Sequence, residues 1–207
     1  MKKPATFHRL WGILLAGILL GGAAFPAGPA RARDLPAIPD LGGETPADRE
    51  LFFAKTQKET TGIPIGHGRR MLWVYFNPDC SYCHRLWNAL AGVSDLTVIW
   101  IPVTFSPKTA SLARSAAILE AKDPARALQQ NEETFNDYRE EGGYPITGSP
   151  SPHTEEEITR NTMLLQMWTG KIATPTLLYR NTQGGVSESV GLPADIPGMV
   201  ATIASAP

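Results

Sequence analysis

A strand pattern that runs directly into a pair of cysteines is the feature that most constrains the fold. Residues 71–76 read MLWVYF, an apolar and aromatic run that suits a strand buried on both faces. Asn77 and Pro78 break this run, and a helix is expected over about residues 80–91. A second buried strand, TVIWIP, follows at residues 97–102. The order strand, helix, strand predicts a βαβ unit with parallel strands.

A helical block is expected between about residues 108 and 170. Its first helix carries Leu112, Ala116 and Leu119 on one face. Asp123-Pro124 has the form of an N-cap followed by a proline at the first helical position, and this helix is expected to reach Gly142-Gly143. The turn-rich segment 142–153 is predicted to be an exposed, mobile loop.

The remaining elements follow from one capping signal and one hairpin signal. Thr154 to Glu157 reads T-x-x-E, a capping box that predicts the start of a helix ending at Gly170. The residues expected to face the core from this helix are Ile158, Leu165 and Trp168. Beyond it, the pattern predicts a strand, a turn, a strand and a weak final helix through Ile203, with the hairpin at 176–180, 181–185 and 186–190.

The first residues have the layout of a secretory signal peptide. Lys2, Lys3 and Arg9 precede an apolar run of roughly 15 residues, shorter than the ~20 needed to span a bilayer. Ala30-Arg31-Ala32 provides a cleavage signal, so residues 1–32 are predicted to be removed on export. Residues 33–68 are expected to form a proline- and glycine-rich arm (34–43), a short helix capped at Thr45 and ending near Glu59, and the loop GIPIGHG.

Size, charge and cysteine content narrow the class of protein. The mature chain would have about 175 residues, enough for one domain with its own core. The formal net charge of −1 argues against a nucleic-acid partner. Both cysteines of the chain, Cys80 and Cys83, lie three positions apart in an exported protein, so we interpret them as reactive rather than structural.

Position on the predicted helix gives the two cysteines different roles. Cys83 begins a core-facing stripe at i, i+3, i+4 and i+7 that continues through Leu86, Trp87 and Leu90, so Cys83 should be buried. Cys80 begins the helix and should be exposed. Unpaired N–H groups at a helix N-terminus stabilise a thiolate, the nucleophilic form of cysteine.

The neighbours of Cys80 are expected to modulate its reactivity. His84 lies one helical turn below Cys80, and when protonated it would favour the thiolate. Asp79 opposes this effect and is interpreted as an ordinary N-cap of the helix. Ser81 and Tyr82, the two residues between the cysteines, complete the set of predicted modulating residues.

Two other hypotheses remain open at this point. Cys80 to His84 spells C-x-x-C-H, a motif that also attaches c-type haem, with Met163 and Met167 as further axial-ligand candidates. These methionines are expected rather to pack in the core. Zinc is disfavoured because a structural site normally needs four ligands. A peptide-binding chaperone without enzymatic activity could use the strand at Pro175 and the loop 142–153.

Two segments together resemble the thioredoxin superfamily. VYFNPDCSYCHRLW (74–87) is similar to its strand, active-site turn and helix, and ATPTLLY (173–179) is similar to its strand with a cis-proline. Within the superfamily, residues 113–130 and 189–200 resemble the periplasmic disulfide isomerase branch of the DsbC/DsbG type, DsbG in particular. This resemblance, over about residues 69–204, implies a thioredoxin-like α/β fold with a helical insertion between the βαβ half and the C-terminal hairpin and helix.

The resemblance also implies a role for each matched residue. Cys80 would be the nucleophile and Cys83 the resolving thiol. Pro175 would be cis, and Thr174 would offer backbone hydrogen bonds to an extended substrate peptide. Expected partners are disulfide- or thiol-bearing exported proteins and a membrane electron donor of the DsbD type, and no cofactor or metal is expected.

The chain departs from this branch at its N-terminal side. Members carry an N-terminal dimerisation domain and a linker helix, whereas only about 40 residues separate the predicted cleavage site from the first buried strand. The predicted domains are therefore a signal peptide (1–32), an arm with a short linker helix (33–68) and a thioredoxin-like domain (69–207). A monomer is favoured, and the direction of electron transfer is left open.

Overall fold

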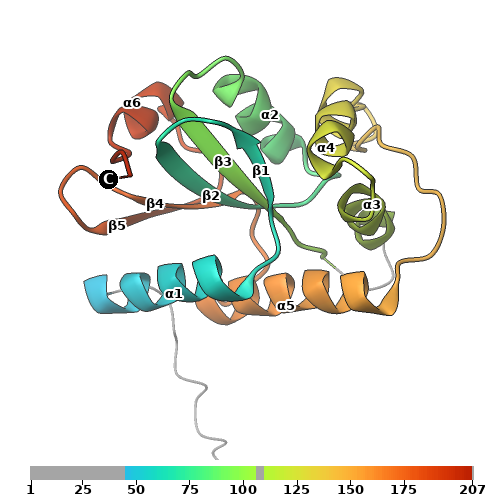
Figure 1. Ribbon diagram of the computed structural model, residues 1–207, viewed down its shortest axis with the longest axis horizontal. Helices are drawn as coiled ribbons and strands as arrows, with labels where there is room; N and C mark the ends of the chain where they lie inside the picture. Colours follow the sequence, from blue (N-terminus) through green and yellow to red (C-terminus); the bar gives the residue numbers. More distant parts are fainter. Residues whose placement is uncertain (1–44, 106–109, 207) are drawn as a thin grey trace, which may run out of the picture. The chain divides into compact units, whose positions relative to one another are not determined.

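A five-stranded mixed sheet forms the centre of the fold (Figure 1). The computed structural model describes residues 45–105 and 110–206, so the predicted signal peptide and the arm at 34–43 lie outside the described residues. The strands lie in the order β1-β3-β2-β4-β5. Their bounds are β1 Ile63–Gly66, β2 Arg70–Phe76, β3 Leu96–Pro102, β4 Thr176–Arg180 and β5 Val186–Val190.

The predicted βαβ unit is confirmed. β2 pairs in parallel with β3, Val74 lying opposite Trp100, and α2 (Ser81–Leu90) connects the two strands. Both strands are buried over most of their length, as their continuous apolar sequences require. β4 pairs antiparallel with both β2 and β5. The segment 173–179, which contains Pro175 and leads into β4, therefore lies next to the strand that precedes the cysteines.

Helices cover both faces of the sheet (Figure 1). α1 (Pro46–Glu59) and α5 (Pro152–Thr169) lie on one face, and α2 and α6 (Ile196–Ala201) lie on the other. α3 (Ala110–Leu119) and α4 (Pro124–Glu133) follow β3 and lie near the start of α2. The predicted α/β class with a helical block between its two halves is therefore confirmed.

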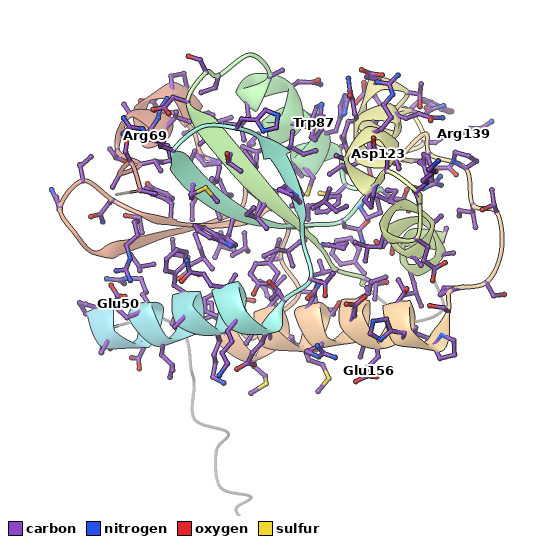
Figure 2. The ribbon with its side chains drawn as sticks, viewed as in Figure 1. Glu50, Arg69, Trp87, Asp123, Arg139 and Glu156 are labelled. Atoms are coloured by element: carbon purple, nitrogen blue, oxygen red, sulfur yellow. The ribbon has the colours of Figure 1, made fainter. Side chains whose placement is uncertain are left out.

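Two apolar clusters hold these layers together, and Figure 2 shows side chains filling the space between the sheet and its helices. On the α2 face, Cys83 and Leu86 pack among residues of β2, β3, α4 and α6. On the α1 face, Phe52 stacks on Trp168 with ring centroids 4.4 Å apart, and Phe53 meets Trp73 edge-on at 4.8 Å. Helix α1 is thus joined to the sheet by buried aromatic contacts.

Several predicted boundaries are confirmed. Thr45 and Asp123 are N-caps, each followed by proline and each accepting a hydrogen bond from the backbone N–H three residues on. Gly170 ends α5 in the left-handed conformation with φ 68°. The 181–185 turn joins β4 to β5, and the final helix ends at Ala201, slightly earlier than expected. None of the helices in the described part of the chain is both long and apolar enough to cross a membrane.

The prediction that GIPIGHG forms a loop is wrong, because its residues 63–66 form strand β1. Pro64 cannot donate a backbone hydrogen bond, which usually excludes proline from a central strand. β1 lies at the edge of the sheet and pairs with β3 alone, so the missing donor is tolerated there. The four-residue strand is also too short to produce a recognisable alternation.

Two helix boundaries in the insertion were predicted wrongly. α4 ends at Glu133 rather than at Gly142, and the Thr134 hydroxyl donates to the Gln130 carbonyl at its end. α5 begins three residues earlier than expected, because Ser151 rather than Thr154 is its N-cap. The Ser151 side chain accepts from the Thr154 N–H, and its own N–H donates to Glu120 Oε1 at 2.8 Å.

The expectation that Met163 and Met167 pack in the core is also wrong. Both side chains are more than half exposed on α5, whereas Ile158, Leu165 and Trp168 of the same helix are buried as predicted. Helix α5 therefore presents one face to the sheet and leaves the two methionines on its outer side.

These opposite faces of α5 generate a stability prediction. Leu165 is fully buried, so Leu165→Ala should lower the free energy of unfolding by about 2–5 kcal/mol through lost burial and a residual cavity. Met163→Ala on the exposed face is the matched control and should change it by no more than about 0.5 kcal/mol. Urea unfolding followed by circular dichroism measures both values, and equal losses in the two variants would contradict the packing described.

Candidate active site

The turn between β2 and α2 is fixed by Asn77. This buried side chain donates from Nδ2 to the Val103 carbonyl (3.3 Å) and accepts the Asp79 N–H at Oδ1 (2.9 Å). The Asn77 carbonyl in turn accepts the Cys80 N–H at 3.1 Å. Cys80 is thereby held at the N-cap position of α2, where it has extended backbone angles.

The two cysteines have different environments, and both are free thiols. Cys83 is 1% exposed, which confirms the prediction from the helical stripe. Leu86 and Leu90 of that stripe are also buried, and Trp87 is half-buried. Cys80 was expected to be exposed but is partly buried, because Thr174 lies against it: the Cys80 sulfur is 3.7 Å from the Thr174 carbonyl oxygen.

This arrangement shifts the pKa values of the two thiols in opposite directions. Hydrogen bonding from the Cys83 thiol, which outweighs the opposing effect of burial, lowers the pKa of Cys80 from 9.0 to about 6. Interactions with the Thr174 hydroxyl and with the N–H groups of Cys83 and Tyr82 lower it further. Burial raises the pKa of Cys83 well above 9.0. At neutral pH Cys80 is therefore the thiolate and Cys83 the thiol.

The segment that faces the cysteines immediately precedes β4. The peptide bond between Thr174 and Pro175 is cis, and Pro175 is buried. The Thr174 hydroxyl is buried and has no conventional hydrogen-bond partner in the described part of the chain. A thiolate at Cys80 gives this hydroxyl an acceptor, which accounts for its contribution to the lowered pKa of Cys80.

His84 is held by the helical insertion. Its Nδ1 lies 3.0 Å from Glu132 Oε2, and its Nε2 lies 2.8 Å from Asn88 Nδ2. Its ring stacks on Phe135 with centroids 4.5 Å apart, a contact made by a residue that follows the end of α4. Burial raises the pKa of Glu132 to about 6, against hydrogen bonds from Asn131 and His84 that lower it.

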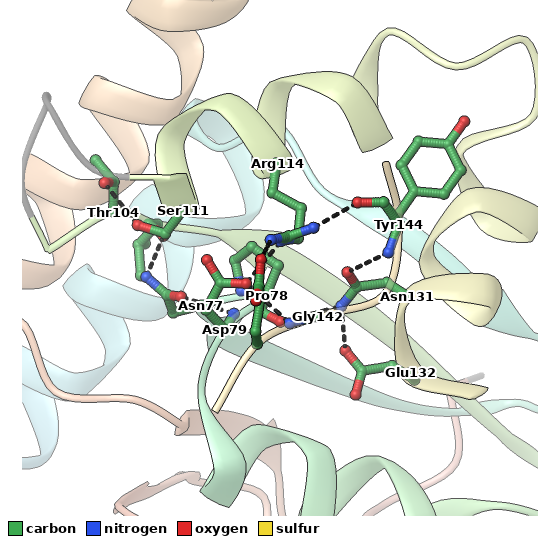
Figure 3. Close-up of polar contacts among 12 residues, drawn as sticks. Asn77, Pro78, Asp79, Thr104, Ser111, Arg114, Asn131, Glu132, Gly142 and Tyr144 are labelled. Carbon is green, nitrogen blue, oxygen red and sulfur yellow. Dashed lines mark hydrogen bonds and ion pairs between the residues drawn. The ribbon is translucent and has the colours of Figure 1, made fainter. Parts of the chain in front are cut away.

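Asp79 does not cap α2, so this prediction is wrong. Its Oδ1 instead accepts hydrogen bonds from Arg114 Nε (2.7 Å) and from the Gly142 N–H (2.9 Å), as Figure 3 shows. The N-cap of α2 is Cys80, which makes no side-chain capping hydrogen bond. The reason is tertiary: the insertion provides a cationic partner that competes successfully with the local backbone donors.

The remaining two predicted modulating residues face outward. Ser81 Oγ donates to Glu140 Oε1 at 3.1 Å. Tyr82 is 54% exposed, and the Arg85 guanidinium lies over its ring at 5.2 Å from the centroid. Both therefore lie on the surface around Cys80 rather than beneath it.

Sequence reasoning missed the residues of the insertion that contact the active-site turn: Arg114, Asn131, Glu132 and Gly142. Asn131 Nδ2 donates to the Pro78 carbonyl at 3.0 Å, and its Oδ1 accepts the Tyr144 N–H at 3.2 Å (Figure 3). The segment beginning at Gly142, predicted to be an exposed loop, is therefore fixed at its start. Arg114 had one recognisable signal, namely a charge among the small and apolar residues of ASLARSAAIL.

The haem hypothesis is disfavoured by the positions of its candidate ligands. Both ring nitrogens of His84 are within hydrogen-bond distance of side chains. Met163 and Met167 are exposed on α5, which lies across the sheet from α2 (Figure 1). Residues 45–105 and 110–206 contain no group of three or more His, Cys, Asp or Glu side chains that could hold a metal ion.

The opposite pKa shifts of Cys80 and Cys83 predict that the two thiols lose their protons in two separate steps as pH rises. In the reduced protein, thiolate absorbance in the ultraviolet should rise with a midpoint near pH 6 and again well above pH 9. Cys80→Ser should abolish the lower step, and Cys83→Ala should move it upward because the S–H donor is lost. A single step near pH 9 in the wild type would contradict the geometry.

The same shift predicts how stability depends on pH. Since folding lowers the pKa of Cys80 from 9.0 to about 6, the unfolded chain binds the extra proton between these values. The contribution of Cys80 to stability is therefore present above pH 9 and is lost as pH falls through 6. Urea unfolding of the reduced wild type and of Cys80→Ser should show the two free energies diverging in favour of the wild type from pH 6 to 9, and parallel curves would contradict this.

Comparison with known proteins gives two curated relatives of the same kind, although no protein-family model matches the chain. The chain is 27% identical over 146 residues to the thiol:disulfide interchange protein DsbG of Pseudomonas aeruginosa, covering 66% of this chain and 54% of the relative. It is 28% identical over 156 residues to DsbG of Escherichia coli, covering 72% and 58%. The chain thus spans little more than half the length of these relatives.

Solved structures add a likeness of fold. A linker-deletion variant of ScsC from Proteus mirabilis matches with a TM-score of 0.53 at 16% identity, over 74% of this chain and 80% of that one. At this identity the match supports the fold alone. The chain is therefore similar in sequence to DsbG and similar in fold to ScsC.

Proposed function

We propose that this chain is an exported thiol:disulfide oxidoreductase that reduces or isomerises disulfides in extracytoplasmic proteins. The observation that carries the proposal is the asymmetry of the cysteine pair. Cys80 lies at a helix N-terminus with its pKa lowered to about 6, and Cys83 is buried with its pKa raised. Thiol–disulfide exchange needs such an ordered pair, one sulfur to attack and one to resolve.

The proposed exchange proceeds in two displacements. The Cys80 thiolate attacks one sulfur of a client disulfide, forming a bond to it, while the other client sulfur leaves as a thiolate and takes up a proton. Cys83 then loses its proton and attacks the Cys80 sulfur, so that the first client sulfur leaves as a thiolate and takes up a proton. The client has gained two electrons and two protons, and Cys80–Cys83 has become a disulfide. In isomerisation a client thiolate displaces Cys80 instead, and no net electrons move.

The segment at Thr174 supports a mode of client binding. In the proposal, an extended client peptide lies along the backbone that precedes β4, with its disulfide beside Cys80. The 3.7 Å approach of the Thr174 carbonyl to the Cys80 sulfur places main-chain hydrogen-bonding groups next to the nucleophile. Recognition through the main chain tolerates many client sequences.

The proposal includes a compartment, a partner and a domain layout. Residues 1–32 would direct export to the periplasm, and residues 69–207 would form the catalytic domain together with α1 and β1, which the structure packs into it rather than leaving as a linker. An oxidised Cys80–Cys83 pair needs a source of two electrons, for which a membrane donor of the DsbD type is proposed. We propose that the protein acts as a monomer. The name of the curated relatives, thiol:disulfide interchange protein, supports the exchange activity.

Replacing the resolving thiol tests the proposed order of attack. Cys83→Ala should accumulate mixed disulfides between Cys80 and clients, because the second displacement is lost. Adducts are separated by non-reducing electrophoresis after acid quenching, and their linkage is mapped by mass spectrometry. The proposal fails if Cys83→Ala forms no adducts with disulfide-bearing periplasmic proteins.

The matched controls locate the adduct on the correct sulfur. Cys80→Ala should form few adducts, since Cys83 is buried and protonated. The double variant should form none. If client binding without adducts persisted in the double variant while Cys83→Ala stayed free of adducts, a chaperone without redox activity would replace the proposed function.

A further inference from the structure

Asp79 is adjacent to Cys80, and at this position a free carboxylate would disfavour the Cys80 thiolate. It directly precedes Cys80, the N-cap of α2. A free carboxylate there would accept hydrogen bonds from the first-turn N–H groups and would repel a neighbouring thiolate. In the structure the Asp79 carboxylate is instead turned toward the helical insertion, where Oδ1 accepts two hydrogen bonds (Figure 3).

Arg114 of α3 is the cation that holds Asp79. It is 4% exposed, and its guanidinium donates in three directions: from Nε to Asp79 Oδ1 (2.7 Å), from Nη2 to Glu141 Oε1 (2.7 Å) and from Nη1 to the Tyr144 carbonyl (2.5 Å). Burying a guanidinium is costly unless its donors are paired, and here each nitrogen has an oxygen partner. The planar guanidinium holds its N–H donors in fixed directions and can therefore bind these three oxygen atoms at once. A lysine ammonium cannot reproduce this geometry.

The third element of this arrangement is the close approach of Gly142. Its N–H donates to Asp79 Oδ1 at 2.9 Å. A Cβ at this position would lie 2.1 Å from Asn131 Oδ1 and 2.5 Å from the Pro78 carbonyl, so only glycine lets the backbone come so near the turn. Arg114 and Gly142 thus hold the same carboxylate oxygen from two separate segments of the insertion.

We propose that Arg114 is a positioning residue: it holds the Asp79 carboxylate away from the N-terminus of α2 and so leaves that N-terminus to the Cys80 sulfur. This inference deepens the proposed function and concerns the same pair of cysteines. The inference gives the helical insertion a function: its Arg114 balances the charge of Asp79, the residue next to Cys80. The step involves no transfer of electrons or protons by Arg114 itself.

A double-mutant cycle tests the inference, with the midpoint of Cys80 thiolate formation as the readout. Arg114→Met should raise this midpoint by about one pH unit, a tenfold change in the thiolate equilibrium, because the released Asp79 then competes for the helix N-terminus. In the Asp79→Asn background the same replacement should raise it by less than half as much. Ultraviolet absorbance of the reduced proteins measures all four midpoints.

Comparing the wild-type and Asp79→Asn backgrounds distinguishes two effects of Arg114: positioning of the Asp79 carboxylate, and direct electrostatic stabilisation of the Cys80 thiolate. If Arg114 acted only as a distant positive charge, its removal would shift the midpoint equally in the wild-type and Asp79→Asn backgrounds, and equal shifts would overturn the proposal. The absence of any shift in either background would also overturn it and would leave Arg114 a structural role. Arg126→Met is the matched control, since Arg126 is an exposed arginine of the same insertion and should leave the midpoint unchanged.

A second variant keeps the test decisive if Arg114→Met does not fold. Arg114→Lys keeps the charge but loses the planar guanidinium, so it should raise the midpoint by a smaller amount, again dependent on Asp79. An Arg114→Lys midpoint equal to that of the wild type in both backgrounds would overturn the proposal. The titration requires no client, so a positive cycle combined with absent client adducts would reject the proposed function alone.

Discussion

The proposed chemistry of this protein depends on the open N-terminus of α2. Cys80 occupies the N-cap position without a side-chain cap, and its sulfur receives the interactions that a capping oxygen would otherwise take. Three residues on, Cys83 is fully buried in the core on the same helix. One helix thereby stabilises a thiolate at its N-cap and a thiol within its first turn, which are the two states that sequential disulfide exchange uses.

The rest of the fold maintains this arrangement. Strand β2 ends at Phe76, and the buried side chain of the next residue, Asn77, fixes the turn. Strand β4 pairs with β2, so that Thr174 meets Cys80. The insertion then contacts the turn through polar side chains, with Arg114 on Asp79, Asn131 on the Pro78 carbonyl and Glu132 on His84. The insertion therefore does more than enlarge the domain: it brings the charged side chains of Arg114 and Glu132 against residues that flank Cys80 and Cys83.

The parts predicted from sequence are those governed by local patterns. The burial of Cys83 follows from helical periodicity, and the β2, β3 and β4 strands follow from short apolar runs. The contacts that were missed join residues far apart in the chain: Asp79 and Arg114 are 35 positions apart, and His84 and Glu132 are 48 apart. No spacing rule relates such pairs. Asp79 was predicted as a cap because the competing cation is invisible to local reasoning.

The other errors have similar causes. Ser151 and Thr154 are both good capping residues, and a tertiary hydrogen bond from the Ser151 N–H to Glu120 favours the earlier start of α5. β1 contains a proline that argues against a strand until its position at the sheet edge is known. In each case the deciding interaction comes from another element of the fold.

A single-turnover reaction of the reduced protein with a disulfide-bridged peptide, followed as a function of pH, tests the central claim most directly. The account predicts one Cys80–Cys83 disulfide formed per peptide reduced, at a rate that rises with a midpoint near pH 6 as the Cys80 thiolate forms. Failure to reduce the peptide, or a rate that rises only near pH 9, the ordinary value for a cysteine thiol, would contradict it.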